Sequence, residues 1–413
     1  MPWKPPKSLL KRHGRTANHP VICVNNKGPA NHLYRAFLIF SPWCDQGLGH
    51  QAKTYVQWLQ DMGHRAVVFA CKPSKKSSAK CPSRMQANWD EWADVTVKYH
   101  AKTREEVPHE DVVSFAEENG VTDALMLETC HTRIFVISAA LSRAGVRVFA
   151  VPNIELVRRC EVQYFRDLGF HRVLCNNQYT LDVLKYFGVP RAKLANFPFS
   201  LRDVQSDLAE LHRPGNTVRF LLVGGMNAER RKQAGKVINA FQRAFSGNLR
   251  AACLTVLCQG TDCPRVGATQ PNVHIVKRHL TYADVLQYYA RSHVVVMLSR
   301  AEGIGLSLHE AMRARCAILS METSMFKELV QPGVNGWLIG YKVEKGTEGA
   351  KLIGNDDPVV HTYTFDPRVL SIAFQSIVGA DVARMQEGAR RAFELMYAPE
   401  RVVTTYTSAL GVA

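Results

Sequence analysis

The sequence predicts an α/β fold in which two domains each contain a doubly wound parallel sheet. Short, apolar, β-branched runs alternate with glycine-containing turns and with segments of helical composition. Such runs are typical of strands that are buried on both faces of a parallel sheet. The pattern restarts at Val218, after a polar stretch from Ser200 to Asn216 that carries Pro214-Gly215 and has the composition of a linker. A chain of 413 residues is long enough for two or three domains with separate cores.

The composition is that of an ordinary soluble globular protein. Hydrophobic residues make up 46% of the chain and charged residues 21%, which is the usual balance for packed domains. No apolar run approaches the ~20 residues that span a bilayer, and the N-terminus lacks the hydrophobic core of a signal peptide. The 11 cysteines are odd in number and have no framework spacing. We therefore expect free thiols in a reducing compartment and a cytoplasmic protein.

The charge of the chain indicates an anionic partner but does not identify it. The formal net charge of +16 suits a nucleoside diphosphate, an anionic membrane surface bound peripherally, or a nucleic acid. No acidic residue precedes Asp45, and we interpret residues 1–34 as a basic N-terminal arm. A second basic segment, Lys72 to Arg84, has the composition of a loop. A solvated charge run is the alternative interpretation for both segments.

The first half of the chain has the elements of one α/β domain. Its strongest strand, Arg35 to Ser41, is followed by Gly47 and Gly49 in a turn and by an amphipathic helix over Thr54 to Met62. Ligands of open parallel sheets bind outside the carboxyl ends of the strands, and His131 follows one such end. Further strands are expected at Ala66–Ala70, Ala124–Leu127, Val146–Val151 and Arg172–Cys175, with a closing strand near Leu194.

The second half repeats this arrangement and ends in helices. Gly224 and Gly225 turn after the strand Val218 to Val223, and the cationic loop Arg230-Arg231-Lys232 leads into a helix. Positive charge at a helix start is unfavourable, so we expect an anion between this loop and the helix amides. The other expected elements are helices at Ala234–Phe245, Tyr282–Ala290 and Leu306–Ala314, strands at Ala251–Leu257, Val273–Val276, Val294–Leu298 and Ile318–Ser320, and two helices within Ala383–Leu410 that separate at Pro399.

One stretch of the second half has the pattern of a ligand site. The strand Val294 to Leu298 runs into a turn, Ser299 to Gly305, and then into a helix. This layout directs free backbone N–H groups and the positive end of a helix dipole toward an anion. Glu302 lies in the turn, and Glu310 follows just over two helical turns later. Backbone amides of the turn suit a phosphate, and the two carboxylates suit hydroxyl groups. Together they indicate a ligand that is half phosphate and half sugar.

The same stretch carries a resemblance to a known family. The segment from Glu302 to Met312 has E-G-x-G-L at one end and E-A-M at the other. It resembles the E-x7-E motif of retaining GT-B glycosyltransferases of the family 4 type, the glycosyl transferases group 1. The resemblance implies the GT-B fold, in which two facing Rossmann-like doubly wound domains enclose a cleft. The alternative is an α/β crossover with incidental surface glutamates.

The resemblance implies roles for particular residues. Lys232 fits the family's lysine and Arg231 is the candidate for its missing arginine, the two neutralising a donor diphosphate. Glu302 would hold the donor sugar and Glu310 the ribose, while His131 would lie near the donor sugar and the acceptor hydroxyl. The candidate catalytic residues are Glu302, Lys232 and His131. The candidate donor-binding residues are Gly47, Arg231, Lys232, Glu302, Gly303, Ile304, Gly305, Leu306 and Glu310.

Three departures from the family pattern bear on the site and on packing. Gln46 stands in place of the first glycine of a pair, and a plain tight turn is the alternative interpretation of Gly47. Thr323-Ser324 replaces a glycine pair near the phosphates. Arg315 replaces a glycine that ends the helix. Polar surface remains the alternative for His131.

The resemblance predicts the domain organisation and the activity. The domains would be a basic arm at 1–34, an acceptor-side domain at 35–205, a donor-binding domain at 206–385, and helices that cross back to the first domain at 386–413. The enzyme would move a hexose, with retention, from a UDP- or GDP-sugar to a glycan, a glycolipid or other lipid-linked acceptor, or a glycoprotein. The chain contains no D-x-D motif, so we expect no metal and no cofactor. A glucosyltransferase that modifies nucleic acid and a non-catalytic nucleotide-sugar-binding protein are the alternatives.

Overall fold

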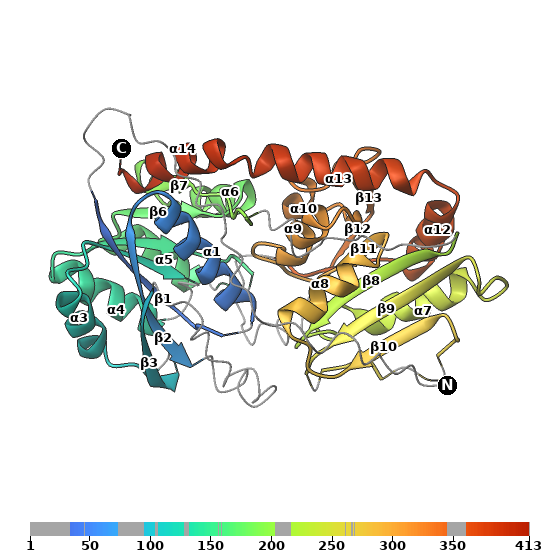
Figure 1. Cartoon of the computed structure of the whole chain (residues 1–413), viewed down its shortest axis with the longest axis horizontal. Coiled ribbons are helices and arrows are strands. Elements are labelled where there is room, and N and C mark those ends of the chain that lie inside the picture. The colour runs from blue at the N-terminus through green and yellow to red at the C-terminus, as the bar shows by residue number, and fades with distance from the viewer. Residues whose placement is uncertain are drawn as a thin grey trace, which may run out of the picture.

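The computed structural model contains two α/β domains joined along one side by a pair of C-terminal helices (Figure 1). It describes residues 34–44, 46–72, 95–103, 106–127, 132–155, 157, 159–202, 216–260, 262–265, 267, 269–344 and 361–412. The basic arm and nearly all of the basic segment after Lys72 lie outside these ranges, so both interpretations stay predictions. The residue boundaries given for the domains also stay predictions.

The N-terminal domain is built on a seven-stranded parallel sheet with the order β3-β2-β1-β4-β5-β6-β7. Residues on alternate sides of β1 pack into different cores: Phe37 and Ile39 into one, and Leu38 and Phe40 into the other. Both faces of the sheet are therefore covered, as the apolar strands predict. The strands are β1 Ala36–Ser41, β2 Arg65–Lys72, β3 Thr96–Thr103, β4 Asp123–Leu127, β5 Arg147–Val151, β6 Arg172–Cys175 and β7 Leu194–Asn196. The helices are α1 Gly47–Asp61, α3 His109–Glu118, α4 Thr132–Arg143, α5 Arg159–Asp167 and α6 Gln178–Tyr186, with a 3₁₀ turn at Arg191–Lys193.

The C-terminal domain has a six-stranded parallel sheet with the order β10-β9-β8-β11-β12-β13. Its central strand β11 is buried along its whole length and pairs with β8 on one side and β12 on the other. The strands are β8 Val218–Gly225, β9 Ala252–Cys258, β10 Val273–Lys277, β11 Val294–Met297, β12 Ala317–Met321 and β13 Gly336–Ile339, and β14 Lys342–Val343 pairs separately with β15 Tyr363–Thr364. The helices are α7 Ala234–Ala244, α8 Tyr282–Ala290, α9 Leu306–Arg313, α10 Ser324–Lys327 and α12 Pro367–Val378.

The last two helices, α13 (Val382–Met396) and α14 (Pro399–Leu410), run across both domains (Figure 1). Helix α13 lies on the C-terminal domain, where a Cβ on Gly388 would come 1.9 Å from the carbonyl oxygen of Val334. Helix α14 lies on the N-terminal domain, where the Tyr406 ring stacks on Phe197 at 3.9 Å between centroids. None of the helices in the described ranges is both long and apolar enough to cross a membrane.

Most predicted elements are present, but the predicted start of one helix was wrong and some elements were missed. Helix α1 begins at Gly47 rather than at Thr54, so Gly47 and Gly49 belong to its first turn and not to a preceding loop. Gly49 is needed there because a Cβ would come 2.0 Å from the carbonyl oxygen of Cys44. Helix α12 was not expected, although Asp366 caps it and Pro367 begins it, which is a standard start signal.

Candidate active site

A cavity of about 370 Å³ lies between the two domains, at the carboxyl ends of both sheets. The strand order reverses between β1 and β4 in one sheet and between β8 and β11 in the other, and parallel sheets bind ligands at such points. Eight of the nine predicted donor-binding residues line this cavity: Gly47, Arg231, Lys232, Glu302, Ile304, Gly305, Leu306 and Glu310. The ninth, Gly303, does not line it.

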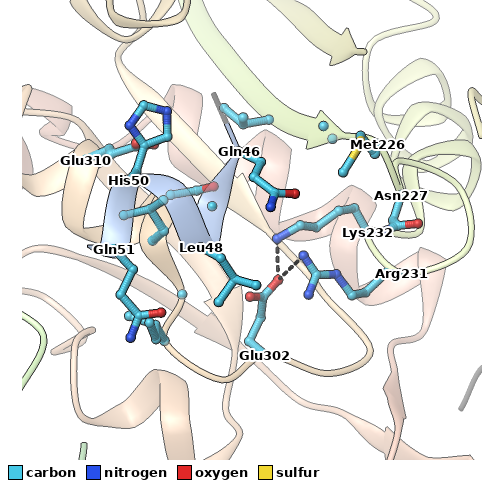
Figure 2. Close-up of a pocket in the computed structure, with 18 of the residues that line it drawn as sticks. Gln46, Leu48, His50, Gln51, Met226, Asn227, Arg231, Lys232, Glu302 and Glu310 are labelled. Carbon is cyan, nitrogen blue, oxygen red and sulfur yellow. Dashed lines mark hydrogen bonds and ion pairs between the residues drawn. The ribbon is translucent and has the colours of Figure 1, made fainter. Parts of the chain in front are cut away.

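Two cations enter the cavity from the loop between β8 and α7. Arg231 and Lys232 both extend toward Glu302 in the centre of the site (Figure 2). The next residue, Gln233, has a left-handed backbone with φ 56°, a conformation that costs a non-glycine residue about 1–2 kcal/mol. Its side chain donates to the carbonyl of Leu298 at 2.7 Å and accepts from the Thr364 hydroxyl at 2.6 Å. These bonds hold the loop in the strained conformation that aims Lys232.

Each cation is already matched by a carboxylate. Lys232 Nζ forms an ion pair with Glu302, and Arg231 forms one with Glu155, which belongs to the other domain. Arg231 Nη2 is also 3.8 Å from Glu302 Oε1. The Lys232 and Glu302 side chains are only 8% and 6% exposed. A bound anion would therefore have to share these cations with the carboxylates or displace them.

The pKa values of the central pair reflect burial and mutual attraction. Burial lowers the pKa of Lys232, and the nearby Glu302 opposes this effect only in part. Burial raises the pKa of Glu302, but the charges of Arg231 and Lys232 outweigh it and hold the pKa below its usual range. Glu302 is therefore ionised at neutral pH. Removing either partner would leave an uncompensated buried charge, which is strongly destabilising.

The turn after β11 presents the start of α9 to the cavity. Gly305 is the N-cap of α9 and has φ 73°, a left-handed conformation that favours glycine. The first N–H groups of the helix have no partner within it, and Leu306 and Ser307 both line the cavity. Gly303 faces the other domain instead. Its carbonyl accepts a hydrogen bond from Asn177 at 2.6 Å, and a Cβ there would come 2.9 Å from that of Asn153.

Glu310 lies on α9 at the opposite end of the cavity from Met226 and Asn227 (Figure 2). It is 4% exposed, and its Oε2 accepts a hydrogen bond from the Tyr289 hydroxyl at 2.7 Å. Tyr282 is a further hydrogen-bonding neighbour. One oxygen of this carboxylate is thus held by protein while the residue still lines the site.

The wall contributed by the N-terminal domain includes three amides, Gln46, Gln51 and Asn153, and Asn176 lies behind them. Asn153 donates to Gln51 Oε1 at 2.9 Å and accepts from Asn176 at 2.8 Å. Asn176 in turn accepts from the Tyr55 hydroxyl at 2.6 Å. Gly47, at the start of α1, faces open space, since a Cβ there would meet no atom within 4 Å. Gly47 lies in the first turn of α1 and not in a separate tight turn, and its contact with a ligand stays a prediction.

A buried histidine, His309, packs against the turn that joins β11 to α9. His309 Nε2 is 3.1 Å from the carbonyl oxygen of Ile304, and Nδ1 is hydrogen bonded to the Tyr397 hydroxyl at the break between α13 and α14. Its ring meets Phe199 of the N-terminal domain edge-on at 5.3 Å between centroids. Burial lowers the pKa of His309 to about 4. The neutral ring thus links the turn between β11 and α9 to the junction of α13 and α14.

The remaining predictions concern features outside the described residues or outside the main cavity. His131 falls outside the described residues, so its role stays a prediction. Thr323 and Ser324 line a small second cavity behind Glu302, not the main one. The N–H of Gly235, near the start of α7, donates to Glu229 at 2.8 Å, so the anion expected there is supplied by the protein. Among the residues that the structure describes, no group of His, Cys, Asp or Glu side chains could hold a metal ion.

Glu155, Gln51 and Asn153 were not predicted from the sequence. Asn153 and Glu155 follow β5, and Gln51 lies in α1, so all three lie at the carboxyl edge of the first sheet. Their place after a predicted strand could have identified them, because the loops that follow parallel strands all lie at the carboxyl edge of the sheet, where ligands bind.

Residues 217–350 match the family model of the glycosyl transferases group 1. No curated protein matches the chain significantly. A glycosyltransferase from Rickettsia africae ESF-5 is similar in structure, with a TM-score of 0.65 and 12% identity over 92% of this chain and 99% of that one. HepE from Anabaena, in complex with UDP and glucose, has a TM-score of 0.61 and 12% identity over 92% and 100%. Sucrose-phosphate synthase from Thermosynechococcus elongatus has a TM-score of 0.61 and 15% identity over the same shares. The chain thus has the GT-B fold, and its segment 217–350 matches the group 1 glycosyl transferases.

Proposed function

We propose that the protein transfers a hexose, with retention and without a metal ion, from a UDP- or GDP-sugar to a hydroxyl of a glycan or lipid-linked acceptor. The observation that carries this proposal is the buried pair of Lys232 and Glu302 beside the start of α9, in a cavity between two parallel-sheet domains. A cation next to helix amides suits a diphosphate, and a carboxylate next to both suits the hydroxyls of the attached sugar.

The leaving diphosphate would be stabilised by charge. Lys232 and Arg231 would share its negative charge with the first N–H groups of α9, which begins at Leu306. Donors aimed at developing charge in a site that excludes water contribute several kcal/mol each. The diphosphate would take over cations that Glu302 and Glu155 hold in its absence.

The two motif glutamates would hold the sugars. Glu302, released from part of its ion pair, would accept hydrogen bonds from hydroxyls of the donor hexose. Glu310 would bind the ribose hydroxyls with the carboxylate oxygen that Tyr289 leaves available. Glu310 is buried and the Glu302 side chain is only 6% exposed, so hydroxyls that fill the site would replace water as their partners.

The transfer would proceed on one face of the sugar. The acceptor oxygen forms a bond to the anomeric carbon while the bond from that carbon to the phosphate oxygen breaks. The acceptor proton passes to the departing phosphate oxygen, so no protein nucleophile is needed. The contacts of Asn177 with Gly303 and of Glu155 with Arg231 join the domains around the site. Such closure would exclude the water that would otherwise hydrolyse the donor. The complex of the structurally similar HepE with UDP and glucose supports UDP as one donor nucleotide to test.

The proposal is tested by incubating the protein with a panel of UDP- and GDP-sugars and measuring the nucleotide released. We expect release from at least one donor, and loss of that release in Glu302→Ala under conditions in which circular dichroism shows the variant to be folded, because removing Glu302 leaves the buried charge of Lys232 uncompensated. Glu322→Ala is the matched control, because Glu322 is a surface carboxylate whose side chain is 51% exposed. Binding of a nucleotide sugar with no release from any donor would instead indicate a binding protein. Steeply salt-dependent binding of DNA or RNA together with donor turnover would point to a nucleic-acid acceptor.

A further inference from the structure

One buried polar group in the cavity has no partner in the protein. Gln259 follows β9 and is 6% exposed. It lines the cavity, and its Oε1 has no hydrogen-bond partner among the residues that the structure describes. A buried carbonyl oxygen left unpaired is unfavourable, and most such groups in native proteins have a partner. Gln259 is therefore placed to meet a partner that a ligand supplies.

The backbone around Gln259 is fixed. Its N–H donates to the carbonyl of Gly225 at 2.9 Å, which ties the end of β9 to the end of β8. A Cβ on Gly260 would come 3.2 Å from the Cα of Met226, so the two loops touch at this point. These contacts fix the backbone that carries the Gln259 side chain. The residue is buried in the site and is not an exposed surface residue.

Apolar and aromatic residues of the C-terminal domain line the same cavity as Gln259. Leu280 is fully buried and Val285 is 7% exposed, and both line the cavity together with Met226. The Tyr282 ring lies 4.2 Å from the ring of His50, between centroids, where the two domains meet. Apolar walls with one polar group are typical of a site for a flat heteroaromatic ring. The cations that suit a diphosphate belong to the same domain.

We propose that Gln259 binds the hydrogen-bonding edge of the donor's nucleobase and so takes part in choosing the nucleotide. This inference rests on the proposed function. A glutamine amide presents an acceptor beside a donor, and uracil presents an N–H beside a carbonyl, so the two edges match. Guanine offers the same pair through N1–H and O6. A glutamate at this position would only accept, which suits the two adjacent N–H donors of guanine and repels a carbonyl of uracil.

The test measures the dissociation constants of UDP, GDP and inorganic pyrophosphate by calorimetry. In Gln259→Leu we expect binding of the preferred nucleotide to weaken about tenfold, with pyrophosphate binding unchanged. In Gln259→Glu we expect the ratio of the two affinities to move about tenfold toward GDP. The added charge weakens both nucleotides alike, so it cancels in this ratio. Gln375→Leu is the control, since Gln375 donates to the carbonyl of Ala244 away from the cavity.

The outcomes separate this inference from the proposed function. If the wild-type protein binds neither UDP nor GDP, both fail. If it binds a nucleotide and Gln259→Leu binds it equally well, only the role of Gln259 is overturned. If Gln259→Glu leaves the ratio of the UDP and GDP affinities unchanged, the role of Gln259 is likewise overturned while the proposed function stands. Circular dichroism and pyrophosphate binding of each variant show whether it is folded, so a loss confined to the nucleotides cannot come from unfolding.

Discussion

The two walls of the cavity differ in the charges that they carry. The C-terminal domain supplies Arg231, Lys232, Glu302 and Glu310, whereas the polar side chains of the described part of the N-terminal wall are three amides (Gln46, Gln51 and Asn153), the imidazole of His50 and one carboxylate, Glu155. A charged wall can stabilise a charge that develops during a reaction. Amides give and accept hydrogen bonds without favouring an ion. Under the proposed function, the charged wall would recognise the donor and the N-terminal wall the acceptor, and each wall can be disturbed separately.

The largest expected effect comes from removing a cation of the charged wall. In Lys232→Met we expect donor turnover to fall about 100- to 1,000-fold, because the leaving diphosphate loses a preorganised partner. The matched control is Lys327→Met. Lys327 lies on α10 outside the main cavity, and its ammonium group pairs with Glu322 at 2.9 Å. Circular dichroism checks that Lys232→Met, which leaves Glu302 without its lysine partner, is folded. Nucleotide release from the best donor is the measurement. Equal losses in the two variants would show that the charged wall does not act on the leaving group.

The next effect concerns His309, which lies between the two walls. Burial lowers its pKa to about 4 from an ordinary value of 6.5. The unfolded chain therefore binds a proton between these pH values that the native protein does not bind, and stability falls as pH drops through this window. The amide in His309→Gln can make the same two hydrogen bonds but does not titrate. The variant should therefore not show this fall in stability with falling pH.

Urea denaturation at pH 7 and pH 5 measures this effect. The wild-type free energy of unfolding should fall more than that of the variant between the two pH values, by on the order of 2 kcal/mol. The carboxylates titrate alike in both proteins and cancel in the comparison. The same pH dependence in wild type and variant would mean that His309 is not held neutral by the fold.

The smallest expected effect is on the amide wall. In Asn153→Ala the hydrogen bonds with Gln51 and Asn176 are lost, while the Cβ that packs against Gly303 is kept. We expect the KM for the acceptor to rise about tenfold or less, with the Kd for UDP or GDP nearly unchanged. Steady-state kinetics with varied acceptor measure the first quantity and calorimetry the second. A weaker nucleotide Kd with an unchanged acceptor KM would contradict the division between the two walls.

The charged wall could be predicted from the sequence because its residues lie close together along the chain. Arg231 and Lys232 are adjacent, and Glu302 to Glu310 form one turn and one helix. Most of the strands could also be predicted, because a strand that is buried on both faces of a sheet is a continuous run of apolar residues. The match of residues 217–350 to the group 1 glycosyl transferases lies in this same half.

The amide wall could not be predicted, because its members meet only through the sheet. Gln51, Asn153 and Asn176 come from α1 and from the ends of two strands, and an isolated asparagine or glutamine carries no spacing signal. Backbone strain was hidden in a similar way. Arg315 was expected to bear on packing, and it has φ 51° at the end of α9. Gln233 has the same kind of backbone beside Lys232, which only its contacts with Leu298 and Thr364 explain.

The crossover of α14 has a consequence for how the chain acquires its structure. Tyr406 of α14 covers Phe197 and meets Trp58 edge-on, so a helix from the end of the sequence completes the apolar surface of the first domain. Domains generally begin to fold in the order in which they are synthesised. Here the first lobe to emerge from the ribosome keeps an uncovered aromatic face while the whole second lobe is being made. The first lobe is thus completed only after the second has been made.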